Sequence, residues 1–244
     1  MNAFAMKIRS FDLEPGRILA RKYEVVRKIG AGWEGEVYKI HERGTDIERA
    51  AKLFFPERNV RNKVADAYAK KLHALKDCPI VIQYHFQETV RFRGTPVTVL
   101  ISEYVEGDLL KEHVRRQPGK RLHVFQAAHL LHALASGIET IHNLGQYHGD
   151  LHDENIIVRR LGLTYELKIL DLFNWGHGGR ESRYDDICDL IRVFYDAVGG
   201  RERYSHQPRQ VKEVCCGLKR SLILKKFRTA RALKLNLEKQ NWAV

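Results

Sequence analysis

The chain of 244 residues has little of what marks disulfide scaffolds, zinc ribbons or membrane proteins. Its four cysteines form no CxxC pair and are too sparse for a disulfide framework, so we expect reduced thiols. No stretch approaches the roughly 18 apolar residues of a membrane-spanning helix, and the first residues lack the apolar core of a signal peptide. The sequence therefore predicts a folded protein with a cytoplasmic location.

Acidic residues are also fewer than basic ones, since the chain has 30 Asp and Glu but 42 Lys and Arg. Residues 201–244 hold 12 of these bases and 3 of the acids, which places +9 of the net +12 in this C-terminal tail. Such a segment attracts an acidic partner or nucleic acid, or it is the solvated side of packed helices. The second interpretation is favoured by apolar residues at helical spacing, namely Val211, Val214, Leu218 and Leu222, then Phe227, Ala230, Leu233 and Leu237.

Hydrophobic patterning divides the chain into a strand-rich half and a helix-rich half. The first half predicts antiparallel strands at 23–30, 36–41, 48–55, 81–90 and 95–104, with one helix at 59–77. The second half predicts helices at 123–145 and 185–200, separated by two short strands within 156–173. The fold class expected from this order is α+β.

The stretch "GAGWEGEV" contains Gly30, Gly32, Gly35 and Val37, in the pattern GxGxxGxV between two predicted strands. A dinucleotide-binding fold would place such glycines between a strand and a helix. A glycine hairpin between strands instead brings backbone N–H groups close to phosphate oxygens, because no Cβ blocks the approach. Lys52 lies on the next strand, which returns beneath the hairpin, so its ammonium group is expected to reach the same phosphates.

The stretch "YHGDLHDENIIV" (147–158) crowds histidines and acids around Asp150 and Asn155, and Asp171 follows in "KILDLF". Phosphoryl transfer needs a carboxylate that orients the attacking hydroxyl and oxygen ligands for Mg²⁺. Asp150 suits the first task, and Asn155 and Asp171 suit the second. A zinc hydrolase site is disfavoured because the order of His and Asp is wrong for one and distant His ligands would be needed.

Together, in this order and spacing, these motifs resemble the protein kinase-like fold from about residue 18 to 200. The resemblance implies a bilobal fold, with an N-lobe at 1–104 and a C-lobe at 105–244, joined at "ISEYVEGDLL" with Ser102 in the gatekeeper place. It implies catalytic roles for Asp150, Lys52 and Asn155, metal binding by Asn155 and Asp171, and support of the catalytic loop by Asp186. The ATP-binding residues that it implies are Gly30, Gly32, Gly35, Val37, Ala50, Lys52, Glu103, Val105 and Asp108.

The function implied by this resemblance is an ATP- and Mg²⁺-dependent phosphotransferase, with Mn²⁺ as a substitute metal, of the serine/threonine-protein kinase type. Its acceptor is expected to be a hydroxyl group of a protein or of a small molecule. Two alternatives remain, a small-molecule kinase of the aminoglycoside or sugar phosphotransferase type and a nucleotide-binding pseudokinase scaffold.

Four departures from the family pattern bear on activity. Tyr68 stands where the helix normally supplies a Glu for Lys52, and the nearest acids are Glu57 and Asp66. The catalytic loop reads HGD and lacks the Arg through which a phosphorylated activation loop acts, which predicts constitutive competence. Phe173 replaces a glycine in "DLF". The segment 171–186 is too short for the usual peptide-docking platform, so the acceptor is a folded protein bound elsewhere or a small molecule.

Overall fold

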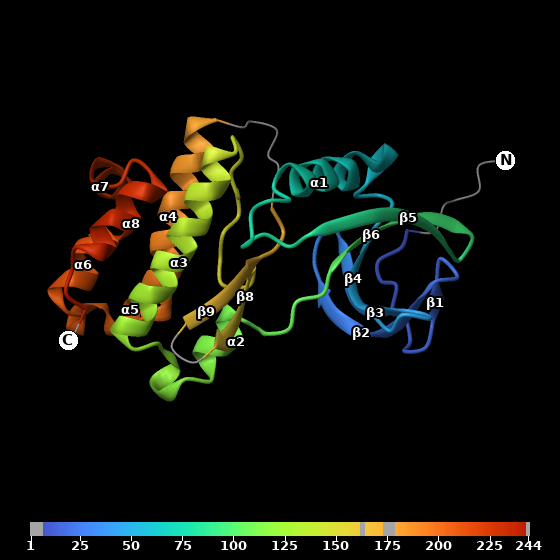
Figure 1. Cartoon of the computed structure of the whole chain (residues 1–244), viewed down its shortest axis with the longest axis horizontal. Coiled ribbons are helices and arrows are strands. Elements are labelled where there is room, and N and C mark those ends of the chain that lie inside the picture. Colours follow the sequence, from blue (N-terminus) through green and yellow to red (C-terminus); the bar gives the residue numbers. More distant parts are fainter. Residues whose placement is uncertain (1–6, 162–163, 173–178, 243–244) are drawn as a thin grey trace. The chain divides into compact units, whose positions relative to one another are not determined.

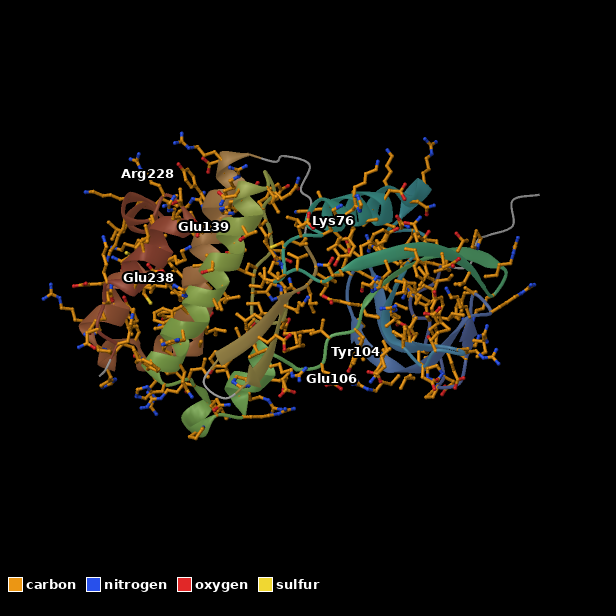
Figure 2. The ribbon with its side chains drawn as sticks, viewed as in Figure 1. Lys76, Tyr104, Glu106, Glu139, Arg228 and Glu238 are labelled. Carbon is orange, nitrogen blue, oxygen red and sulfur yellow. The ribbon has the colours of Figure 1, made fainter. Side chains whose placement is uncertain are left out.

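The structure is a computed structural model that describes residues 7–161, 164–172 and 179–242. The chain divides into two compact units. Unit 1 consists of Met1–Lys76 and Ile82–Tyr104, and unit 2 consists of Asp77–Val81 and Val105–Val244. Figure 2 labels Lys76 and Tyr104, the last residue of each segment of unit 1.

Unit 1 is built on a six-stranded antiparallel sheet (Figure 1). Its strands are β1 (Ile18–Leu19), β2 (Tyr23–Ala31), β3 (Gly35–Glu42), β4 (Glu48–Phe54), β5 (Tyr84–Phe92) and β6 (Thr95–Glu103). Their order in space is β1-β2-β3-β4-β6-β5, so β6 lies between β4 and β5. The five predicted strands are confirmed, and the two-residue β1 adds an edge that the sequence did not reveal.

The two faces of this sheet differ in burial, as the alternation along β3 shows. Glu36, Tyr38 and Ile40 point to one face and are buried, whereas Val37 between them is half-buried on the other. The face that carries Tyr38 and Ile40 holds the main apolar core of unit 1. The opposite face carries Val37, to which the resemblance assigns ATP binding.

The core face is closed by the segment 8–13, which precedes the first strand. The Phe11 ring stacks on Phe55 and meets Phe92 edge-on, each at 5.2 Å between ring centroids. Buried Glu36 accepts hydrogen bonds from the Ser10 hydroxyl (2.7 Å) and from the Phe11 N–H (3.2 Å). Because Glu36 directly follows the glycine hairpin, this segment fixes the start of β3.

The helix of unit 1, α1 (Lys63–Ala74), is shorter than the predicted 59–77. Asn62 adopts a left-handed conformation that stops the helix from starting earlier, and the Asn59 side-chain oxygen accepts the N–H groups of Val64 and Ala65 at 3.1 Å each. Tyr68 is among the buried residues of this helix.

Unit 2 is mainly helical. Its helices are α2 (Leu110–Arg115), α3 (Val124–Asn143), α4 (Arg180–Ala197), α5 (Gly200–Arg203), α6 (Arg209–Cys215), α7 (Arg220–Lys226) and α8 (Ala230–Glu238). A small antiparallel sheet joins β7 (Asp108–Leu109), β8 (Ile156–Leu161) and β9 (Thr164–Ile169). The long helix α3 packs against α4 and α8 and also contacts β9 (Figure 1). A sheet-based unit 1 and a helical unit 2 confirm the predicted α+β class.

The basic tail 201–244 packs through most of the apolar positions predicted for it. Val211, Val214, Phe227 and Leu233 are buried, among others. The prediction is wrong for Leu222, whose exposed fraction is 46%. Helical spacing from Val211 to Leu222 places these residues on one side only in a continuous helix, but the chain turns at 216–218 between α6 and α7, which resets the helical phase. The tail therefore uses its apolar side for packing and presents its bases to solvent.

Among the described residues, no helix combines the length and the apolar character that crossing a membrane requires. The cytoplasmic location stays a prediction.

Candidate functional site

The predicted phosphate- and base-binding residues of unit 1 lie on three neighbouring strands. The glycine hairpin joins β2 to β3, and the Gly32 N–H donates to the Gly35 carbonyl at 2.9 Å. In the antiparallel register Val37 of β3 faces Lys52 of β4, and Gly30 of β2 faces Val37. The sheet thus brings Gly30, Gly32, Gly35, Val37 and Lys52 together, as the sequence predicted.

Gly35 is required by the close approach of β3 to β4. A Cβ atom at this position would lie 1.9 Å from the Leu53 carbonyl oxygen, a backbone atom that cannot rotate away. Gly35→Ala is therefore expected to lower the free energy of unfolding by about 1–3 kcal/mol, measured by denaturant melting. Gly32→Ala is the matched control, because no atom lies within 4 Å of its added Cβ, and a change below about 0.5 kcal/mol is expected. Equal losses in the two variants would contradict this packing.

Lys52 has an ion-pair partner that the sequence did not suggest. Its Nζ lies 2.9 Å from Oε2 of Glu34, a residue of the glycine hairpin, and 4.8 Å from the ring centroid of Tyr68. Tyr68 on α1 therefore occupies the place where a Glu was expected, and it offers Lys52 an aromatic face. Asp66, the other predicted candidate, contacts the Gln87 side chain at 3.5 Å. An acid between Gly32 and Gly35 was the available signal for Glu34.

The predicted hinge shows a second local arrangement in unit 1. Ala50 on β4 pairs with Ser102 on β6, and Ser102 is buried. Glu103 donates its N–H to the Gln83 carbonyl (2.9 Å), and its side chain accepts the Gln83 N–H (3.1 Å). The Glu103 carbonyl in turn accepts a hydrogen bond from the Ser102 hydroxyl at 3.5 Å.

In unit 2, the stretch 147–155 forms a loop organised by His148. The buried His148 ring accepts the Asp150 N–H at Nδ1 (3.2 Å), and its Nε2 lies 2.9 Å from the Leu170 carbonyl oxygen. A carbonyl oxygen can only accept, so Nε2 carries the proton and the ring is a neutral tautomer. His148 is thus a structural residue that connects the loop to the end of β9.

Asp150 is presented on the outside of this loop. The Asn155 side chain donates from Nδ2 to the Asp150 carbonyl at 2.8 Å, which fixes the backbone from the other side. The carboxylate itself has an exposed fraction of 50%, and His152 Nε2 lies 3.7 Å from its Oδ2. The geometry is that of a rigid backbone carrying an accessible carboxylate.

Asp186 of α4, which is fully buried, supports this loop through hydrogen bonds. Its two carboxylate oxygens accept the backbone N–H groups of His148 (2.7 Å) and Gly149 (2.8 Å), and His142 Nε2 lies 2.9 Å from it. Gly149 has a φ of +89°, a conformation that L side chains rarely adopt. The supporting role that the resemblance implied for Asp186 therefore has a clear structural counterpart.

The two predicted metal ligands are brought together by backbone pairing. The Leu170 N–H donates to the Asn155 carbonyl at 2.8 Å, which places Asp171 directly after a residue bonded to Asn155. Because Asn155 Nδ2 donates to a carbonyl, its Oδ1 is the atom left to bind a cation. An amide oxygen and a carboxylate fit Mg²⁺, which prefers oxygen ligands. The described residues contain no group of three or more His, Cys, Asp or Glu arranged to hold a metal.

Asp171 has a φ of +47°, which is unusual for a residue other than glycine. Such strain is often found at functional sites. Leu172 beside it is buried, as expected for the hydrophobic position of the motif. Phe173, the predicted departure from the family pattern, lies outside the described residues.

Asp108, the predicted ribose contact, lies on β7 opposite Val158. Its carboxylate forms an ion pair with Arg116 at 2.6 Å, so a ribose hydroxyl would have to share it. Val105, the other predicted hinge residue, is half-buried.

Asp189 is an ionisable group near the loop that the sequence did not single out. Burial raises its pKa to about 7, and the negative charges of Asp186, Asp185 and Asp150 add to this, whereas a hydrogen bond from the Leu151 backbone opposes it. The native state therefore binds the proton at pH values where the unfolded chain has lost it.

The pH dependence that follows has a definite sign. Because the folded pKa lies above the ordinary value of 3.8, the contribution of Asp189 to stability is complete below about pH 4 and is lost as the pH rises to about 7. Asp189→Asn has no carboxyl group to titrate, so this loss disappears. Between pH 5 and 8 the free energy of unfolding of the variant should therefore rise relative to that of the wild type by a few kcal/mol, at about 1.4 kcal/mol per pKa unit. Denaturant melts across this range measure it, and parallel curves for the two proteins would contradict it.

Comparison with known proteins agrees with this architecture. The kinase domain of PknI from Mycobacterium tuberculosis superposes with a TM-score of 0.67 at 19% identity, covering 94% of this chain and all of that one, which shows a shared fold. Cyclin-dependent kinase B2-2 of Arabidopsis thaliana is 28% identical over 165 residues, and serine/threonine-protein kinase PknG of Mycobacterium leprae is 29% identical over 164. Each alignment covers 66% of this chain, but only 51% and 21% of those proteins.

The chain thus spans about half or less of the length of these curated relatives. The family model described as the protein kinase domain matches residues 23–188, from the first strand of the glycine hairpin to the helix that carries Asp186. This match covers more than half of the sequence, and the chain therefore belongs to the protein kinase domain family.

Proposed function

We propose that this chain is an active, ATP- and Mg²⁺-dependent protein kinase of the serine/threonine type. The observation that carries the proposal is the loop around Asp150. Its backbone is held from three sides by His148, Asn155 and Asp186, while the Asp150 carboxylate stays accessible. A positioned but solvent-accessible carboxylate is what an incoming hydroxyl acceptor needs.

Residues 1–104 would then act as the nucleotide-binding lobe and residues 105–244 as the catalytic lobe. In the first, the hairpin glycines and Lys52 hold the phosphates of ATP, and Val37, Ala50 and Glu103 contact the base. Val105, the first residue of the second, also contacts the base. In the second, Asp108 contacts the ribose, and Asn155 Oδ1 and the Asp171 carboxylate hold Mg²⁺ or Mn²⁺. When bound there, the metal would neutralise charge on the phosphate oxygens, and Asn155 and Asp171 would be its ligands from this chain.

The transfer step is a displacement at the γ-phosphorus. The acceptor hydroxyl oxygen forms the new P–O bond while the bond to the β,γ-bridging oxygen breaks, and ADP leaves with that electron pair. The hydroxyl proton passes to the Asp150 carboxylate. Asp150 contributes mainly by orienting the acceptor hydroxyl group, because this group becomes acidic only as the new P–O bond forms.

The Lys52–Glu34 ion pair predicts how nucleotide binding depends on the hairpin. The Glu34 carboxylate pairs with the Lys52 ammonium group, which the phosphates of ATP would otherwise attract. The side chains of Lys52 and Glu34 are both largely buried. Glu34→Gln is therefore expected to tighten ATP binding by up to about fivefold, since a partly exposed ion pair contributes about 0.2–1 kcal/mol. Isothermal calorimetry with ATP and Mg²⁺ measures the change, with Glu14→Gln, an exposed acid of the same unit, as the control. Weaker binding in Glu34→Gln would show that Glu34 instead positions Lys52 for the nucleotide.

The experiment that tests the proposed function follows transfer of labelled γ-phosphate. Purified protein is incubated with Mg²⁺, labelled ATP and either generic protein substrates or a panel of sugars and aminoglycosides. Label in phosphoserine or phosphothreonine supports the proposal, and label only in small molecules would replace it with the small-molecule kinase alternative.

The pseudokinase alternative is favoured by one observation, the presence of Tyr68 where the helix would supply a Glu. It predicts no transfer to any acceptor together with a partner-binding role. Thermal shift with ATP separates the cases, because an intact metal pair predicts a rise in melting temperature that depends on Mg²⁺.

A further inference from the structure

The helical unit contains a cavity that none of the roles above uses. Its volume is about 670 Å³. It opens between the C-terminal part of α3, the first turn of α4 and the start of α8. Figure 2 labels Glu139 on α3 and Arg228 just before α8, both of which line it. A cavity of this size admits one side chain with part of its backbone.

The wall of this cavity is strongly basic. The described residues that line it include four arginines, Arg180, Arg183, Arg228 and Arg231, but a single carboxylate, Glu139. Glu139 is already engaged by Lys234 and, at 3.9 Å, by Arg231. Within the part of the chain that the structure describes, no carboxylate lies within ion-pair distance of Arg180, Arg183 or Arg228. The residues that line the cavity therefore carry an excess of positive charge.

All four bases are arginines, and this points to the kind of anion. A guanidinium group offers a planar fork of donors that matches two oxygens of a phosphate at once, whereas a lysine offers a point charge. Several forks around one recess suit a phosphomonoester, which carries close to two charges and three terminal oxygens. In addition, Gly179 supplies no side-chain cap to α4, so the positive end of that helix also faces the recess.

We propose that this arginine cavity binds a phosphorylated serine or threonine in a segment of another protein. The shape favours a phosphorylated segment over nucleic acid, which is bound along an extended basic groove with exposed aromatic rings. Among the described lining residues, Tyr184 could offer such a ring. The Arg180 guanidinium carbon lies over this ring, 5.6 Å from its centroid. The proposal does not depend on the phosphotransferase activity, since binding can be measured without turnover.

The test uses the full chain, treated with phosphatase and saturated with a non-hydrolysable ATP analogue and Mg²⁺ so that the predicted active site is blocked. The probes are a fluorescent peptide with one phosphoserine between neutral residues, its unphosphorylated twin, and a labelled single-stranded DNA 20-mer. Fluorescence anisotropy should show binding of the phosphopeptide at least about 10-fold tighter than its twin, since each charge-assisted hydrogen bond contributes about that factor or more.

Two double variants that lose the same charge make the test specific. Arg183→Gln with Arg228→Gln removes cavity residues from two elements and should weaken phosphopeptide binding about 10-fold or more. Lys225→Gln with Lys239→Gln removes exposed bases of the same tail outside the cavity and should change binding by less than about threefold. If the first variant does not fold, Arg183→Lys with Arg228→Lys keeps the charge and should still weaken binding.

Three outcomes would overturn the proposal. One is equal affinity for the two peptides, and another is the same loss of binding in the cavity and control variants. The third is binding of the DNA alone, lost in the cavity variant, which would assign the cavity to nucleic acid instead.

Discussion

Replacing Asp150 with Asn is expected to lower kcat by about 10²- to 10⁴-fold and to leave the fold unchanged. The substitution keeps the size of the side chain but removes the proton acceptor, and positioned acid–base groups contribute about that factor. The backbone contacts of Asp150 with His148 and Asn155 do not involve its carboxylate, so they remain. Initial rates of phosphate transfer, together with thermal melting of both proteins, measure the two parts of this prediction.

Asp153→Asn provides the matched control within the same loop. The contact of this residue with Lys111 is made by its backbone carbonyl, so the substitution removes one charge near Asp150 without disturbing the loop. We expect its kcat to stay within about twofold of the wild type, and KM for ATP to be little changed in both variants. If Asp150→Asn transfers phosphate as fast as Asp153→Asn, Asp150 is not the proton acceptor and the proposed function loses its main support.

The parts of the site that could be predicted from sequence are those set by local geometry. The glycine hairpin, Lys52 on the following strand and the loop around Asp150 each lie within a short stretch, where spacing and alternation determine which side chains meet. The same holds for the five strands of unit 1 and for α3, whose apolar periodicity continues over its whole length.

Contacts between distant segments could not be predicted in this way. The segment 8–13 carries no motif, yet it closes the core of unit 1 through Phe11 and the buried Glu36. Glu34 was missed for the same reason, because only the fold shows that its carboxylate meets Lys52 across the hairpin. The exposure of Leu222 depends on the turn after α6, where the left-handed φ of Cys216 is not encoded by a glycine.

The family resemblance supplied one long-range relation, the link between Asp186 and the loop 38 residues before it along the chain. Spacing alone would not have identified it, since "DDICDL" is an ordinary amphipathic stretch with several acids. The structure separates these acids clearly. Asp186 is fully buried and accepts backbone N–H groups, whereas Asp185 is exposed and pairs with Arg220.

Asp186→Ala is expected to lower the free energy of unfolding of the chain by about 3–5 kcal/mol. The variant leaves the N–H groups of His148 and Gly149 buried without an acceptor, and each such group costs about 1–3 kcal/mol. His142 also loses its buried partner. A loss of this size is a large part of the 5–15 kcal/mol that stabilises a typical domain, so urea unfolding should show it as a clear shift in midpoint.

Asp185→Ala separates this effect from the loss of any acid on α4. Its ion pair with Arg220 is exposed, so its removal should cost less than about 1 kcal/mol. Asp186→Asn keeps one acceptor oxygen but turns an NH₂ group toward a backbone N–H. Its free energy of unfolding should therefore lie between those of Asp186→Ala and Asp185→Ala. Its kcat should fall more than its stability suggests, because the Asp150 backbone depends on the loop that Asp186 holds. If Asp186→Ala unfolds at the same urea concentration as Asp185→Ala, the carboxylate does not support the loop.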